Sequence, residues 1–213
     1  MYKVAVFPIP NCVTFPGTSF PLHVFEPRYR NMIQYCLEND SLLAIAHTQK
    51  VLREAKTDQA PAEVLQSNQA TYKPYPIFSA GKCELLQTLD DGRLYLQVHM
   101  ESRFQAIEEE QTLPFSIFCC EAYSDVPVET DQLKTTALLK DKVLNRLLAL
   151  TASVSDIQML LKSEEWSKKS VSDFSFSIFS LLQFNPELQQ QVLEMQSVEG
   201  RLNYLLDMLN KKS

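Results

Sequence analysis

The sequence predicts an α+β protein, with a β-rich part over residues 1–122 and a helical part over residues 123–213. In the first part, short apolar stretches alternate with polar residues at the two-residue period of half-buried strands. From Thr130 onwards, leucines recur at the three- and four-residue spacing of amphipathic helices. At 213 residues, of which 45% are hydrophobic, the chain is long enough to bury a sizeable core.

Residues 5–30 open the β-rich part with two strands joined by a tight turn. Pro16-Gly17 predicts the turn, because proline presets φ at the second turn position and glycine accepts a positive φ at the third. The second strand follows, and along it Phe20, Leu22 and Val24 alternate with Pro21, His23 and Phe25. Aromatic side chains therefore lie on both faces of this strand, although only one face can belong to the core.

A helix begins at Pro27, where the missing N–H of proline costs nothing. Glu26 stands where a carboxylate favours a helix N-terminus, and it is also within reach of Arg30. We interpret Glu26, Arg28 and Arg30 as a structural charge cluster, because most such clusters lie outside catalytic sites.

The middle of the chain predicts a long surface loop followed by a meander of strands. Residues 48–73 are polar and show little periodicity, which favours a loop with one short helix. Residues 75–122 alternate as strands. Asp91-Gly92 predicts a two-residue hairpin turn in which both residues have positive φ.

Helix-capping signals divide the C-terminal part. A capping box at Ser155 starts a short helix, Ser170 caps a helix rich in phenylalanine, and Ser197 caps the last one. Asn185-Pro186-Glu187 starts another helix with a cap, a proline and an acid. The phenylalanines Phe174, Phe176, Phe179 and Phe184 either pack between helices or line a groove for unfolded peptide, and core packing is the favoured alternative.

These motifs resemble the substrate-binding N-terminal domain of the Lon protease family. The resemblance rests on the opening strand, turn and helix start, on Asp91-Gly92-Arg93, on Arg103-Phe104, and on the last two helices. The residues that we assign to the structural motif are Pro16, Gly17, Glu26, Pro27, Arg28, Arg30, Asp91, Gly92 and Arg103. Where the family usually has a glycine before Arg-Phe, this chain has Met100-Glu101-Ser102, so we expect the bend there to be built differently. The resemblance implies a PUA-like twisted β-barrel or pseudobarrel with a helical bundle.

Charge and composition exclude several classes of function. The formal net charge is −6, and residues 1–129 carry all of it, with 10 basic against 16 acidic residues. Such a surface repels phosphate backbones, so we expect no nucleic-acid partner. No apolar stretch approaches the length that a membrane-spanning helix needs, and the five cysteines are irregularly spaced, which is typical of reduced thiols in a cytoplasmic protein.

The chain lacks the motifs of an enzyme. Its four glycines, Gly17, Gly81, Gly92 and Gly200, are too far apart for a phosphate-binding loop, and the serine–lysine peptidase part of Lon has no counterpart. Metal-ligand spacings are missing, so we expect neither a metal nor another cofactor. Cys12 with His23 stays open as a cryptic nucleophile pair, although free cysteines are mostly buried small hydrophobes.

The resemblance then implies a stand-alone, non-catalytic domain that binds unfolded or partly folded protein segments. A separate ATPase or protease is a further partner that the resemblance suggests. The predicted peptide-binding residues are Phe20, His23, Phe25 and Tyr29. Two alternatives remain. One is RNA binding, by analogy with other PUA-like folds. The other is a cryptic hydrolase that uses Cys12 or a serine.

Overall fold

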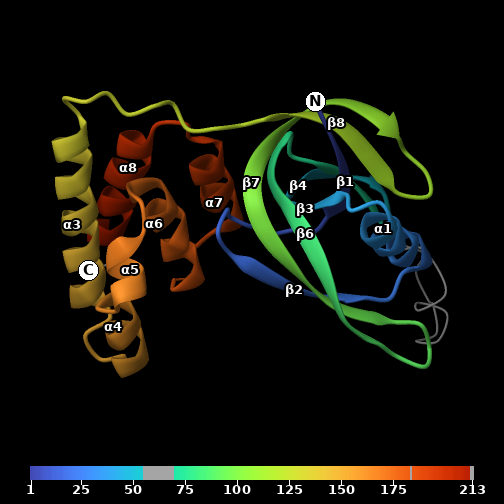
Figure 1. The fold of residues 1–213 in the computed structure, drawn as a ribbon, viewed down its shortest axis with the longest axis horizontal. Coiled ribbons are helices and arrows are strands. Elements are labelled where there is room, and N and C mark those ends of the chain that lie inside the picture. Colours follow the sequence, from blue (N-terminus) through green and yellow to red (C-terminus); the bar gives the residue numbers. More distant parts are fainter. Residues whose placement is uncertain (55–69, 183, 212–213) are drawn as a thin grey trace. The chain divides into compact units, whose positions relative to one another are not determined.

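The computed structural model describes residues 1–54, 70–182 and 184–211. These residues form two compact units, shown as ribbons in Figure 1. The first comprises Met1–Tyr123 and Pro186–Leu193, and the second comprises Ser124–Asn185 and Glu194–Ser213. The first is built on a sheet and the second on helices, so the predicted α+β class is confirmed. Among the described residues, no helix combines the length and apolar character that a bilayer crossing requires.

The first unit contains a six-stranded mixed sheet in the order β2-β7-β6-β3-β1-β8. Its strands are β1 (Tyr2–Pro8), β2 (Ser19–Val24), β3 (Leu42–Ala46), β6 (Ile77–Thr88), β7 (Leu94–Gln111) and β8 (Ser116–Ala122). The far half of the long strand β7 also pairs with β8, which curls the sheet into a pseudobarrel. Helix α1 (Pro27–Glu38) begins at the predicted proline. Its apolar face, with Met32 and Ile33 fully buried, belongs to the main core cluster.

The Pro16-Gly17 turn has the predicted geometry. Gly17 has a φ of 74°, and the Thr18 N–H donates to the Phe15 carbonyl at 3.3 Å. The Gly17 N–H donates to the Met100 carbonyl and the Met100 N–H donates to the Thr18 carbonyl, both at 2.8 Å. The turn therefore attaches the start of β2 to the middle of β7.

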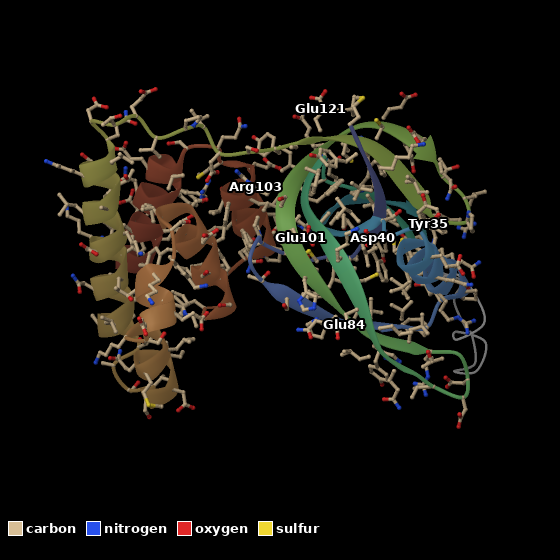
Figure 2. The ribbon with its side chains drawn as sticks, viewed as in Figure 1. Tyr35, Asp40, Glu84, Glu101, Arg103 and Glu121 are labelled. Carbon is tan, nitrogen blue, oxygen red and sulfur yellow. The ribbon has the colours of Figure 1, made fainter. Side chains whose placement is uncertain are left out.

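A β-bulge makes the bend of β7 where the family has its glycine. Ala80 pairs with Ser102 and Gly81 pairs with Met100, so Glu101 is the extra residue on β7. Glu101 is labelled on the curved part of this strand in Figure 2. A Cβ on Gly81 would lie 1.7 Å from the His99 carbonyl oxygen. The glycine is thus supplied by the neighbouring strand, where it allows the two backbones to approach closely.

The hairpin lies at Asp91-Gly92, but its turn differs from the predicted one. Gly92 has a φ of 81°, whereas Asp91 is not among the described residues with positive φ. The Gly92 N–H donates to the Leu89 carbonyl, and the Leu89 N–H donates to the Arg93 carbonyl, each at 2.9 Å. This is a longer loop in which glycine alone takes the left-handed position. The Asp91 carboxylate accepts a hydrogen bond from the Arg93 N–H at 3.1 Å, which stabilises this alternative.

The predicted loop at 48–73 contains a two-stranded sheet, β4 (Thr48–Arg53) paired with β5 (Thr71–Pro74). No alternation of apolar and polar residues indicates this sheet, because β4 is mostly exposed on both faces. Residues 55–69 lie outside the described residues, so the short helix expected within 48–73 stays a prediction.

Helix α7 (Pro186–Glu194) belongs mainly to the first unit, whereas the sequence predicts it in the helical part. The Arg103 guanidinium donates to the Leu193 carbonyl at 2.6 Å, and the Gln190 amide donates to the Ile77 carbonyl at 2.9 Å. Figure 2 shows Arg103 on the side of β7 that faces this helix. His47 is buried, accepts a hydrogen bond from the Asn11 N–H at Nδ1 (3.1 Å), and lies 3.8 Å from the Glu187 carboxylate.

The second unit is a helical bundle of α3 (Leu133–Leu150), α4 (Ser155–Leu161), α5 (Glu164–Lys168), α6 (Val171–Ser177), the 3-10 turn η1 (Ile178–Ser180) and α8 (Val198–Lys211). Ser170 and Ser197 make the predicted caps. Ser155 does not, because it is already the first residue of α4, where its side chain makes no cap. The segment before Ser170 contains α5, with Trp166 buried.

Candidate functional site

The structure separates the four residues predicted to bind peptide. Tyr29 is 5% exposed and stacks on Phe7 with ring centroids 3.9 Å apart, so it is a core residue and not a surface anchor. Phe20 is half-buried and packs against the same core. His23 is exposed, and its ring stacks on Tyr95 at 4.4 Å. Phe25 lies beside His23 at 6.3 Å, so the outward face of β2 carries a small aromatic patch.

The charge cluster at the start of α1 divides into two parts. Glu26 pairs with Arg28 at 3.0 Å and not with Arg30, the partner that we had considered. The nearly buried Arg28 also donates to the Thr71 hydroxyl at 3.0 Å and to the Ala70 carbonyl at 2.6 Å. Arg28 therefore connects the start of α1 to the start of β5. The opening motif has a structural role, because it holds the small β4–β5 sheet in place.

The β4–β5 sheet forms one wall of an apolar groove, and the β7–β8 hairpin forms the other. Two hollows of about 310 and 530 Å³ make up the groove and share Leu52, Tyr72 and Ser116. Leu52 is 58% exposed, Ile107 51% and Leu113 81%. Tyr75 and Phe118 add partly buried aromatic surface. Sequence reasoning missed this groove because its residues come from a segment with no periodicity and from the ends of two strands.

Cys12, one of the residues considered for chemistry, has a thiol that burial keeps protonated. Burial raises the pKa of the Cys12 thiol to about 11, so the nucleophilic thiolate is disfavoured. Among the described residues, no group of three or more His, Cys, Asp or Glu side chains is arranged to hold a metal ion. Phe174 and Phe176 are buried, and Phe179 and Phe184 pack on the helical core with ring centroids 4.9 Å apart. These phenylalanines form core, as the favoured alternative predicted.

The family model of the ATP-dependent protease La (Lon) substrate-binding domain matches residues 3–211. The chain belongs to the Lon substrate-binding domain family. Two solved structures have the same Lon-type fold. The Lon N-terminal domain of the Mycobacterium avium complex aligns with a TM-score of 0.70 and 16% identity, covering 99% of this chain and all of that one. The Lon N-terminal domain protein of Xanthomonas campestris aligns with a TM-score of 0.62 and 18% identity, covering 97% of this chain and 98% of that one.

Comparison with a whole Lon protease shows how much of that protein this chain covers. Lon protease 1 of Herpetosiphon aurantiacus is 26% identical over 138 residues, which is 65% of this chain. The match covers 16% of the relative's length. The part of Lon that this chain resembles is therefore the substrate-binding domain, and the predicted PUA-like, Lon-type pseudobarrel is confirmed at the level of the fold.

Proposed function

We propose that this member of the Lon substrate-binding domain family binds unfolded or partly folded protein segments at the groove between the β4–β5 sheet and the β7–β8 hairpin, and that the domain itself catalyses no reaction. The observation that carries the proposal is the exposure of Leu52, Ile107 and Leu113 around two joined hollows. Large apolar side chains gathered at a concave surface are typical of sites that bind apolar segments.

The position of the groove supports the same proposal. Arg28 of the family motif holds the start of β5, and β5 forms one wall of the groove. The motif that places the chain in a substrate-binding family thus also organises this surface. An ATP-dependent protease that receives the bound segment is the partner that Lon relatives suggest. The acidic excess of residues 1–129 argues against RNA as the ligand.

A binding experiment tests the groove. Reduced and carboxymethylated α-lactalbumin, fluorescently labelled, is titrated with the protein and followed by anisotropy. We expect Ile107→Ser and Leu113→Ser each to weaken binding by about 1 kcal/mol or more, the usual effect of removing an interface anchor. Because both side chains are exposed, the melting temperature should stay unchanged.

Leu138→Ser is the matched control. Leu138 is 62% exposed on α3 of the helical unit, so the change removes the same kind of surface side chain away from the groove. Binding that is equally sensitive to all three changes, or insensitive to the two groove changes, would reject the groove as the site. The variant His23→Ala tests whether the aromatic patch of His23, Phe25 and Tyr95 also contributes to binding. The sequence predicts that His23 and Phe25 bind peptide.

A further inference from the structure

Two cysteines of the first unit face each other between α1 and β6. Cys36 lies on the buried face of α1 with Met32 and Ile33 and is 2% exposed. Cys83 of β6 pairs with Val98 of β7, and directly opposite residues of adjacent strands lie on the same face of a sheet. Because Val98 is fully buried, Cys83 also points towards the core. Cys36 belongs to the main core cluster, and Cys83 packs against that cluster.

The two sulfur atoms are in hydrogen-bonding contact. The Cys36 thiol donates a hydrogen bond to the Cys83 sulfur. The Leu42 carbonyl is a poorer acceptor for this thiol, because it lies 4.0 Å from the Cys36 Sγ. A disulfide requires the sulfurs to approach to about 2 Å. Since they are already in contact, a small rotation of the two side chains and a small shift of α1 bring them together.

This pair differs from the cysteines that only fill the core. Burial raises the pKa of the Cys12 thiol to about 11 and that of Cys120 to about 12, so both stay protonated. Cys83 is half-buried, and the hydrogen bond from Cys36 lowers its pKa against the opposing effect of burial. The pKa of Cys36, which keeps its proton in that hydrogen bond, is raised. The more exposed thiol of the pair is therefore the one that ionises.

We propose that Cys83 is a site of reversible oxidation by hydrogen peroxide and that Cys36 converts the oxidised Cys83 to a Cys36–Cys83 disulfide. In the first step the Cys83 thiolate attacks one peroxide oxygen. An S–O bond forms and the O–O bond breaks, so Cys83 becomes a sulfenic acid, and the departing hydroxide takes up the proton that Cys83 released and leaves as water.

The second step joins the two cysteines. The Cys36 sulfur attacks the Cys83 sulfur, so an S–S bond forms and the S–O bond breaks. The hydroxide that leaves Cys83 takes the Cys36 proton and becomes a second water. In total, the two sulfurs lose two electrons to the peroxide. Neither cysteine lines the groove, so this inference does not rest on the proposed function.

Peptide mapping of the parent protein tests the proposal. The folded, reduced protein is treated with about one equivalent of hydrogen peroxide, blocked with N-ethylmaleimide and digested with trypsin. Trypsin cuts after lysine and arginine, so it places Cys36 in peptide 31–50 and Cys83 in peptide 83–93. We expect mass spectrometry to show these two peptides joined, with the loss of two hydrogen atoms. Free thiols should fall from five to three per chain, and dithiothreitol should restore them.

The same treatment in urea is the control for the folded arrangement. Because urea separates the two sulfurs, the joined peptides should become a minor product among random pairings. Joined peptides that form only in urea, a disulfide between other cysteines in the folded protein, or five thiols that all survive the peroxide would each overturn the proposal.

Three variants assign the two roles. Cys36→Ser should leave Cys83 as a sulfenic acid that reacts with dimedone, whereas Cys83→Ser should leave Cys36 reduced and unlabelled. Cys119→Ser is the matched control. Cys119 is half-buried like Cys83, but its sulfur contacts the Met1 thioether at 3.6 Å, so this variant should form the joined peptides as the parent does. Dimedone labelling of Cys36 in Cys83→Ser, with none of Cys83 in Cys36→Ser, would contradict the assigned roles.

Discussion

Arg201 in the helical unit and the exposed side chains of the β unit have opposite environments. In the helical unit, Arg201 is fully buried and pairs with Asp125 through two hydrogen bonds of 2.7 Å. It also donates to Ser175 and to the Met195 carbonyl. In the β unit, the Arg30 guanidinium makes one hydrogen bond among the described residues, of 3.5 Å to the Asp91 carbonyl, and Leu52, Ile107 and Leu113 are exposed around hollows.

This difference distinguishes side chains that stabilise the fold from side chains that can bind a ligand. A buried arginine with several partners specifies one arrangement of the segments that it joins, here the chain before α3, the N-terminal end of α6 and the start of α8. Apolar side chains that stay exposed at hollows contribute little to folding, and they are available to a ligand. We therefore infer that Arg201, like the buried Arg28 and Arg103 of the β unit, stabilises packing, whereas Leu52, Ile107 and Leu113 serve recognition.

The largest effect expected is the loss of stability on Arg201→Met. Removing the guanidinium leaves the Asp125 carboxylate, whose side chain is 18% exposed, without its strongest partner. Breaking one side of a buried ion pair costs about 3–5 kcal/mol. Urea unfolding followed by far-ultraviolet circular dichroism measures the change.

The double variant Arg201→Met/Asp125→Leu is the control for that measurement. Because it removes both charges, it should be less destabilised than the sum of the two single variants. Additive single effects would show that the two side chains act independently, and the contrast between the units would lose its main support.

A smaller but still large loss is expected for Gly81→Ala in the β unit. The new methyl group would meet the His99 carbonyl at 1.7 Å, so one strand has to move at the bulge. We expect a loss of about 3 kcal/mol, in the upper range for single substitutions. Gly200→Ala, in α8, is the matched control. Its Cβ would lie 3.3 Å from the Ser197 side chain, and alanine favours a helix by up to about 1 kcal/mol. Equal melting temperatures for the two variants would contradict the role given to Gly81.

The smallest effect concerns pH. Burial lowers the pKa of His47 below its usual 6.5, and the nearby Glu187 carboxylate opposes this shift only in part. The unfolded chain therefore binds a proton more readily than the folded one. Stability should be fully present above pH 6.5 and should fall, by at most about 1.4 kcal/mol per pH unit, as the pH decreases towards the folded pKa.

His47→Gln removes this titration, so unfolding curves of the variant between pH 7 and pH 5 should depend less on pH than those of the parent. A parent protein whose stability rises as the pH falls through this window would show that Glu187 outweighs burial.

Local features were predictable where a few neighbouring residues determine them. The Pro16-Gly17 turn, the start of α1 at Pro27, the caps at Ser170 and Ser197 and the hairpin position at Asp91-Gly92 all depend on backbone preferences and short-range hydrogen bonds. The turn type at Asp91 was wrong because a side chain, which accepts from the Arg93 N–H, selected another loop. The strands β4 and β5 were missed because they are paired through their backbones without an alternating buried face.

The candidate surfaces were less predictable than the fold. Two of the four predicted binding residues, His23 and Phe25, lie at an exposed aromatic patch, whereas Tyr29 is in the core. Helical and strand spacing identifies which residues share a face but not which face another element will cover. The groove combines segments far apart in the chain, so no local pattern could indicate it.

The sequence by itself determined the α+β class, the family, several helix starts and turn positions, and the acidity of the β-rich part, because composition, periodicity and capping act over a few residues. Only the tertiary structure decided the pairing of β7 with β8, the packing of α7 with the sheet, and the partners of each arginine. Arg28, Arg30, Arg103 and Arg201 are chemically identical side chains in the sequence. What distinguishes them is which carboxylates and carbonyls the fold brings within hydrogen-bonding distance, and Coulomb attraction and desolvation depend on that distance and that burial.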